Sequence, residues 1–118
     1  SRHEESYHNA LAWFRSLERT EYPTAILCFN DQQALAVMSA LRELNIRVPE
    51  EISIIGNDDI DYAKLYPVPL TTIRAPQMEI GRRAAEILIR NIESPLLLPP
   101  ERILLETELV VRNSSRTL

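Results

Sequence analysis

Two short apolar runs separated by a helical pattern constrain the fold more than any other feature of the sequence. The runs are Ala25–Phe29, which is apolar throughout, and Ile52–Ile55, which is apolar except for Ser53. Continuous apolar runs of this length are typical of strands buried on both faces, as in parallel sheets. Between them, Gln32–Leu44 places apolar side chains at three- and four-residue steps, which predicts a helix. This order of elements predicts an α/β fold with a mainly parallel sheet.

The rest of the chain continues the alternation of helices and short strands. Ser1 and Glu4 have the spacing of a capping box, and apolar residues follow at helical steps, so residues 1–19 are predicted to form a helix. The polar tail Asn113–Leu118 is predicted to be frayed. The other predicted elements are a helical turn at Tyr62–Leu65, a strand at Leu70–Ile73, a helix at Gln77–Asn91 and a strand at Leu104–Val111.

Polar side chains follow both apolar runs, where the predicted strands end. Asn30 and Asp31 follow the first run, and Asp58, Asp59 and Asp61 lie in the loop after the second. Ligands of open parallel sheets bind beyond the carboxyl ends of the strands, so these residues are candidates for a binding site. Other interpretations remain open: Asn30 or Asp31 caps the next helix, and Asp58 orders its own loop. Asp59 and Asp61 are interpreted as loop or solvent carboxylates.

Composition and charge favour a globular domain of 118 residues. The single cysteine, Cys28, excludes an internal disulfide and is predicted to be a small core residue, because it lies inside an apolar run. The net charge of −4 repels phosphate backbones, so this part is a poor candidate for direct DNA contact. No run approaches the length of a membrane span and no secretory signal opens the chain, so we expect a cytoplasmic protein without membrane contact. The missing initiator Met leaves open that something precedes Ser1.

Catalysis and metal binding are not predicted. The carboxylates after the second run could hold Mg²⁺ for phosphoryl transfer, but the chain has only two glycines and no phosphate-cradling GK[ST] sequence. His3 and His8 are five residues apart and do not share a helix face, so a joint metal site is not expected. No Cys-His or Ser-His-Asp arrangement is recognisable. We therefore expect no enzyme activity, no metal and no cofactor.

Four stretches, in their order and spacing, resemble the C-terminal third of LacI/GalR-type transcriptional repressors. They are PTAILCFNDQQALAVMSALRELNIRVPEEISIIGNDDID, PLTTIRAP, MEIGRRAAEILI and ILLETELVVRNS. The resemblance implies a type I periplasmic-binding-protein fold, with two doubly wound subdomains hinged around a ligand cleft. It assigns residues 1–75 and 101–118 to the C-terminal subdomain, and residues 76–100 to the last helix and crossover of the N-terminal subdomain. By this resemblance, a DNA-binding headpiece and most of the N-terminal subdomain would precede these residues. Half of the cleft wall would then be missing from the chain, so the chain alone is expected to bind effector weakly or not at all, because a one-sided site buries too little ligand surface.

The resemblance also implies a function. It implies the sensing of a small-molecule effector, a sugar or another small metabolite, by a repressor that binds operator DNA through its headpiece. Asn30, Asp31 and Asp58 match effector-binding positions, and carboxylate and amide groups suit the recognition of hydroxyls. Asn57 departs from the family pattern, in which an aromatic residue is common, and this puts stacking on a sugar in doubt. The alternative is a secreted periplasmic solute-binding protein of the same fold.

Three further residues match the dimer interface of the family. Leu35 and Ser39 lie on the predicted helix 32–44, and Tyr66 lies in the loop before the third strand. The other interpretation of Leu35 is packing in the core of its own subunit. The resemblance therefore implies a homodimer built on this part of the chain.

Overall fold

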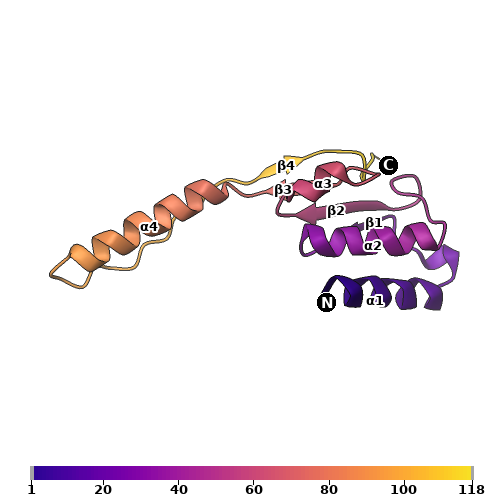
Figure 1. The fold of residues 1–118 in the computed structure, drawn as a ribbon, viewed down its shortest axis with the longest axis horizontal. Coiled ribbons are helices and arrows are strands. Elements are labelled where there is room, and N and C mark those ends of the chain that lie inside the picture. Colours follow the sequence, from indigo (N-terminus) through magenta and orange to yellow (C-terminus); the bar gives the residue numbers. More distant parts are fainter. Residues whose placement is uncertain (1, 118) are drawn as a thin grey trace. The chain divides into compact units, whose positions relative to one another are not determined.

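The computed structural model describes residues 2–117, which form two compact units (Figure 1). Unit 1 comprises Ser1–Arg74 with Leu109–Leu118, and unit 2 comprises Ala75–Glu108. Ser1 of the expected capping box lies outside the described residues. In chain order, the elements are α1 (Arg2–Ser16), the 3-10 turn η1 (Arg19–Glu21), β1 (Ala25–Leu27), α2 (Asp31–Glu43), β2 (Ser53–Asn57), α3 (Asp61–Leu65), β3 (Thr71–Arg74), α4 (Gln77–Glu93) and β4 (Glu108–Val110).

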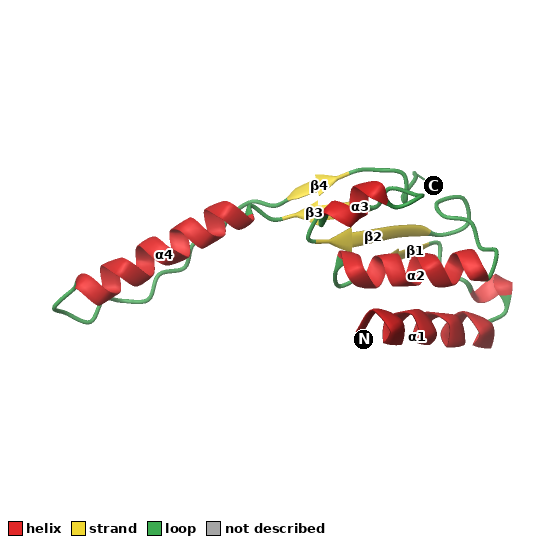
Figure 2. Ribbon diagram, in the orientation of Figure 1, coloured by secondary structure: helices red, strands yellow, loops and turns green. Residues whose placement is uncertain are grey.

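The strands form one sheet in the order β1-β2-β3-β4 (Figure 2). β1 pairs with β2 in parallel, with Ile26 opposite Ile54, and β2 pairs with β3 in parallel, with Gly56 opposite Thr72. Parallel neighbours need a connection that returns the chain to the starting edge, and the segments that contain α2 and α3 provide it. The predicted α/β fold with a mainly parallel sheet is confirmed.

β1 differs from its prediction in both length and burial. The strand ends at Leu27, and the side chains of Leu27 and Phe29 are 68% and 82% exposed. The prediction of a strand buried on both faces was therefore wrong for β1. The reason is its position, because within residues 2–117 β1 is an outer strand of the sheet and pairs on one side only, with β2. β2 lies inside the sheet, and its Ile54 is fully buried, as predicted.

The core of unit 1 lies where α2 covers the sheet. Its fully buried members include Leu41 of α2, Ile54 of β2 and Leu70. Burial of one such side chain stabilises a fold by about 1.5–3 kcal/mol, which is why the helical spacing of apolar residues predicted α2 correctly. α1 packs on α2 through a second, smaller cluster of Ala10, Leu11 and Ala40.

Cys28 lies in the core, as predicted. Its side chain is buried among the cluster that contains Phe14 and Met38. Burial, followed by the negative charge of Asp31, raises the pKa of the Cys28 thiol to about 11. The thiol therefore stays protonated at neutral pH and acts as a small apolar side chain.

The segment after β4 is ordered by buried hydrogen bonds. Ser114 is fully buried, and its Oγ accepts from the backbone N–H of Thr71 at 2.8 Å and donates to the carbonyl of Ile54 at 2.6 Å. The prediction of a frayed tail was therefore wrong for this segment. A polar serine gave no sign of burial in the sequence, because the groups that it satisfies lie about 43 and 60 positions earlier.

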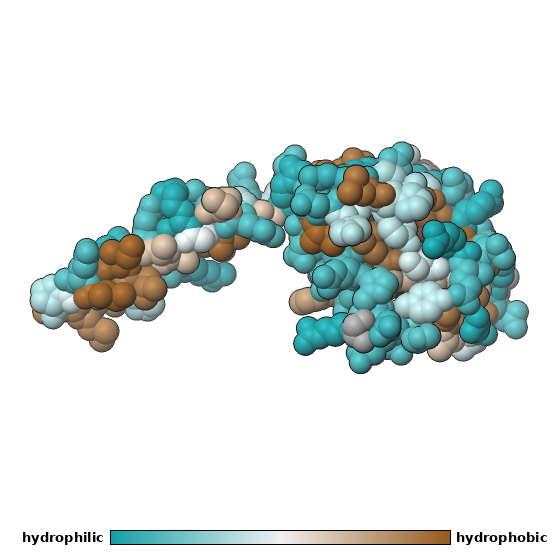
Figure 3. Space-filling model, in the orientation of Figure 1, coloured by the Kyte–Doolittle hydropathy of each residue, from teal (hydrophilic) through white to brown (hydrophobic). Residues whose placement is uncertain are grey.

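Unit 2 consists of α4 and the extended return of the chain. Pro76 precedes the first turn of α4, where its missing N–H costs nothing, as predicted. No residue of α4 is buried, and apolar side chains gather on it (Figure 3). The exposed ones include Ile80, Leu88 and Ile92. Arg82 pairs with Glu79 and Glu86 at 2.6 and 2.5 Å, which forms the solvated face of this amphipathic helix.

Candidate functional site

The loops that follow β1 and β2 meet at one edge of the sheet. Asn30 follows the first strand, and Asn57 and Asp58 lie at the end of the second. The Asn57 Nδ2 group lies 3.5 Å from the carbonyl oxygen of Phe29, so the two loops are in contact. The predicted site residues Asn30 and Asp58 are therefore brought to the same edge.

Asn30 is the N-cap of α2. Its Oδ1 accepts a hydrogen bond from the backbone N–H of Gln33 at 2.9 Å, which satisfies one of the free amides at the helix start. The capping interpretation of Asn30 is thus confirmed. The cap uses the side-chain oxygen, so the Nδ2 group of this half-buried residue remains suited to donate to a ligand hydroxyl.

Asp31 lies behind the edge rather than on it. Its side chain is fully buried, and its Oδ1 accepts from the Thr72 hydroxyl at 2.6 Å while its Oδ2 accepts from the N–H of Ile60 at 2.9 Å. Gly56 makes room for this carboxylate, because a Cβ at position 56 would lie 2.2 Å from the Asp31 Oδ1. Asp31 therefore connects the start of α2 to β3 and to the loop after β2, and it does not face solvent.

Asp58 is presented to solvent by an uncommon backbone conformation. Its φ of 118° lies in the left-handed region, which non-glycine residues rarely adopt and which is often found at functional sites. Its N–H donates to the Ile73 carbonyl at 2.9 Å, and its Oδ1 lies 3.3 Å from the Asn57 Nδ2. β3 thus holds the Asp58 backbone while the carboxylate is exposed at the edge.

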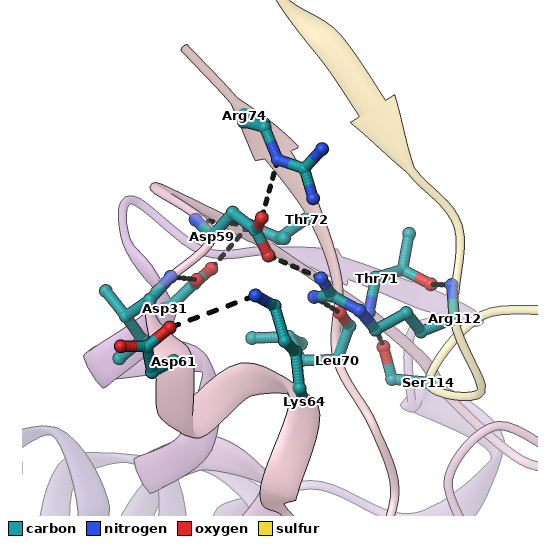
Figure 4. A network of polar contacts seen from close by, with 11 residues as sticks. Asp31, Asp59, Asp61, Lys64, Leu70, Thr71, Thr72, Arg74, Arg112 and Ser114 are labelled. Carbon is teal, nitrogen blue, oxygen red and sulfur yellow. Dashed lines mark hydrogen bonds and ion pairs between the residues drawn. The ribbon is translucent and has the colours of Figure 1, made fainter. Parts of the chain in front are cut away.

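The two remaining carboxylates of this loop have different environments. Asp61 begins α3 with a 97% exposed side chain, and its Oδ1 lies 3.8 Å from Lys64 Nζ, which agrees with a solvent carboxylate. The Asp59 side chain is only 5% exposed and pairs with Arg74 and Arg112 (Figure 4). Of the two interpretations of Asp59, as a loop or a solvent carboxylate, the structure agrees with the loop carboxylate and contradicts the solvent one.

Asp59 is held by two guanidinium groups. Its Oδ2 accepts from Arg74 Nε at 2.6 Å, and its Oδ1 accepts from Arg112 Nη2 at 2.5 Å. Burial raises the pKa of the Asp59 carboxyl, but the hydrogen bonds and charges of Arg112 and Arg74 outweigh burial and lower the pKa below its ordinary value. Sequence reasoning missed Arg74 and Arg112, because their partner lies 15 and 53 positions away.

A small polar pocket adjoins Asn30. It has a volume of about 370 Å³ and is bounded by the N-terminal turns of α1 and α2. The side chains that line the pocket are Arg2, His3, Glu5, Ser6, Asn9, Phe29, Asn30, Gln32 and Gln33.

Within residues 2–117 no group of three or more His, Cys, Asp or Glu side chains could hold a metal ion.

The three candidate dimer residues lie close together, but they differ in burial. Leu35 is buried in the core of unit 1, so the core-packing interpretation applies to it. Ser39 and Tyr66 are half-buried, and their hydroxyl oxygens are 2.6 Å apart. Tyr66 also lines an apolar groove of about 580 Å³ together with Met38, Ile46 and Val68.

None of the described helices is long and apolar enough to cross a membrane.

Comparisons with known proteins identify the family. Residues 1–115 match the model of the periplasmic binding protein-like domain. A relative named as the transcriptional repressor PurR of Vibrio atlanticus is 48% identical over 77 residues, which cover 65% of this chain and 23% of that protein. The arabinose metabolism transcriptional repressor of Geobacillus stearothermophilus is 38% identical over 96% of this chain and 34% of its own length.

A solved structure extends the likeness to the fold. A LacI-family transcriptional regulator from Arthrobacter sp. FB24, in complex with lactose, superposes with a TM-score of 0.83 at 31% identity, over 97% of this chain and 41% of that one. The chain spans about a third or less of the length of the curated relatives. The chain belongs to the periplasmic binding protein-like domain family. Within this family, it corresponds to the C-terminal part of the effector-binding region of LacI/GalR-type transcriptional regulators.

Proposed function

We propose that the chain is the effector-sensing and dimerisation core of a DNA-binding transcriptional repressor. The observation that carries the proposal is the exposure of Asp58 at the same edge of the sheet as Asn30, at the carboxyl ends of two adjacent parallel strands whose following loops are in contact. That edge is where ligands of open α/β sheets bind. The relatives are transcriptional repressors, which supports this function over a secreted solute-binding protein and over catalysis.

The proposed effector is a small polyhydroxyl compound, most simply a carbohydrate. The Asp58 carboxylate can accept hydrogen bonds from two hydroxyl groups, and the Asn30 amide can donate one to a hydroxyl oxygen, so the two residues can recognise the hydroxyls of one ligand. Asp31 contributes indirectly, by holding both loops from behind. Lactose in the Arthrobacter structure and arabinose in the name of the Geobacillus repressor support a sugar, and no cofactor or metal is needed.

The proposed mechanism is allosteric and acts within a homodimer. Unit 2 would belong to a second subdomain, as the expected assignment of residues 76–100 implies, and effector bound at the Asn30–Asp58 edge would shift the equilibrium between two states of the protein. A ligand shifts such an equilibrium only through its different affinities for the two states. Operator DNA would be contacted by a headpiece ahead of these residues, in the cytoplasm. Sequencing the coding region upstream of the Ser1 codon tests this, because a helix-turn-helix is expected there and a secretory signal would contradict it.

An NMR titration of the ¹⁵N-labelled chain tests the effector class. Arabinose and lactose are the probes, and adenine is the comparison. We expect sugar-dependent shifts of the Asn30 and Asp58 amide signals at millimolar concentrations, since a one-sided site buries too little ligand surface for tight binding. Asp58→Asn should remove the shifts, whereas the control Asp61→Asn, in the same loop, should retain them.

Two outcomes would contradict the proposed site. Equal shifts in the Asp58→Asn variant would remove Asp58 from the binding residues. Shifts at this edge with adenine alone would keep the edge as a binding site but replace the carbohydrate by a heterocyclic base.

A further inference from the structure

Asp59 joins the loop after β2 to both segments that connect the two units. Arg74 is the last residue of β3 and the last of unit 1 before Ala75. Arg112 follows β4, through which the chain returns to unit 1. The two oxygens of the Asp59 carboxylate each accept from one of these guanidinium groups, at 2.6 and 2.5 Å (Figure 4). One side chain therefore bridges the end of β3 and the segment after β4, in addition to the pairing of these two strands in the sheet.

The contacts of Arg112 make this connection rigid. Its side chain is only 13% exposed, and its Nη1 donates to the carbonyl of Leu70 at 2.9 Å. Its backbone N–H donates to Thr71 Oγ1, also at 2.9 Å. The Arg112–Asp59 pair is shielded from water and fixed by these additional hydrogen bonds, so its geometry is held more firmly than that of the Arg74–Asp59 pair, whose arginine is 44% exposed.

Asp59 is also coupled to the ligand edge. It follows Asp58 directly, and both residues have positive φ angles, 118° and 52°. The N–H of Asp58 donates to Ile73, the residue before Arg74, and the N–H of Asp59 lies 3.4 Å from Thr72 Oγ1. A change in the position of Asp58 therefore cannot leave Asp59 and the end of β3 unaffected. Because the Asp59 carboxylate faces the two arginines, it is not placed to contact a ligand at the edge.

We propose that Asp59 is a positioning residue that couples occupancy of the Asn30–Asp58 edge to both segments connecting the units. Effector that binds to Asp58 would displace the loop after β2. Arg74 and Arg112 would then pass this displacement from Asp59 to β3 and β4 together. The proposal rests on the proposed effector function. It differs from a purely stabilising role, because it requires that Arg112 act on Arg74 through Asp59.

A double-mutant cycle without ligand tests the coupling. Amide hydrogen exchange is measured at Arg74 in the whole chain, in the wild type, Asp59→Asn, Arg112→Lys and the double variant. We expect Arg112→Lys to speed this exchange roughly tenfold when Asp59 is present and to have no further effect in the Asp59→Asn background. Equal effects of Arg112→Lys in both backgrounds would overturn the coupling, whatever the chain binds. Asp59→Glu, which keeps a carboxylate, should restore part of the non-additivity.

A second arm adds sugar and separates this proposal from the effector function. With arabinose or lactose, wild-type exchange at Arg74 and Leu109 should slow. Asp59→Asn should bind the sugar with a Kd within about threefold of wild type and lose the slowing. Retained slowing, or a Kd weakened as much as in Asp58→Asn, would overturn the positioning role. A non-additive cycle with no sugar effect in the wild type would support the coupling and contradict the carbohydrate effector.

Discussion

At the scale of single residues, the polar groups behind the edge matter more to the fold than those on it. Among residues 2–117, no buried side-chain nitrogen or oxygen lacks a hydrogen-bond partner. Asp31 illustrates the cost of disturbing this arrangement, because its buried carboxylate satisfies the Thr72 hydroxyl and the Ile60 amide. When one partner of a buried hydrogen bond is removed, the other is left with no hydrogen-bond partner, neither from water nor from the protein.

Asp31→Ala is therefore expected to lower the free energy of unfolding by about 3 kcal/mol, because it leaves the buried Thr72 hydroxyl and the part-buried N–H of Ile60 without their hydrogen-bond partner. Asp31→Asn keeps the shape and one acceptor oxygen, so its effect should be smaller. Urea unfolding of both variants and the wild type measures the difference. A stability of Asp31→Ala within measurement error of the wild type would show that water replaces the carboxylate.

The Asp59 carboxyl should make stability depend on acid pH. Its pKa is lowered in the fold, so it stabilises the fold fully above its unfolded pKa of 3.8, and this contribution is lost as the pH falls through the folded value. The stability difference between wild type and Asp59→Asn should be constant near neutral pH and shrink below about pH 4. Urea unfolding from pH 7 to pH 2 measures it. A difference that does not change with pH would contradict the paired, ionised state of Asp59.

At the scale of elements, helical periodicity predicted α1, α2 and α4, because their buried or apolar stripes are local in sequence. The apolar runs located β1 and β2 for the same reason. What they could not reveal is strand order, on which burial depends, and so the exposed edge position of β1 was missed. The prediction also failed for the tail, since Ser114 is ordered by groups far away in the sequence.

The same contrast applies to the candidate site. Asn30 and Asp58 could be placed at one edge because strand ends of a parallel sheet coincide. Burial separated Asp31 from them, and only the close approach permitted by Gly56 explains why. Asp59 looked equivalent to Asp61 in sequence, but distant arginines gave it a different role.

Ser114→Ala tests the contribution of the tail to unit 1. The substitution leaves the buried N–H of Thr71 and the carbonyl of Ile54 without their present partner, so a loss of about 1–3 kcal/mol in the free energy of unfolding is expected. Ser115→Ala is the matched control, since Ser115 is only half-buried and shares a single hydrogen bond with Thr71 Oγ1. Equal losses for the two variants in urea unfolding would contradict the specific role of Ser114.

At the scale of the whole molecule, the proposed homodimer needs an apolar surface that unit 1 does not cover by itself. α3 provides such a surface, because the side chains of Tyr62 and Leu65 are exposed. Tyr66, which follows α3, lines the apolar groove described above. Buried Leu35 lies beneath this region rather than on it and supports the surface from below. Exposed apolar patches of this kind are typical of protein interfaces.

Tyr66→Asp should therefore weaken self-association, because a dimer would bury the new carboxylate without a partner. Sedimentation equilibrium over a range of chain concentrations measures the dissociation constant, and an increase of at least about tenfold is expected, equivalent to 1.4 kcal/mol. Trp13→Ala is the matched control, since Trp13 is a half-exposed aromatic residue on α1 that lies outside the Tyr66 groove. Equal weakening by both variants would place the interface away from Tyr66. A wild-type chain that stays monomeric at all concentrations would contradict dimerisation through this unit alone.

Tyr66→Phe isolates the contribution of the Tyr66 hydroxyl, which lies 2.6 Å from the Ser39 hydroxyl. If packing of the ring dominates, this variant should associate as the wild type does.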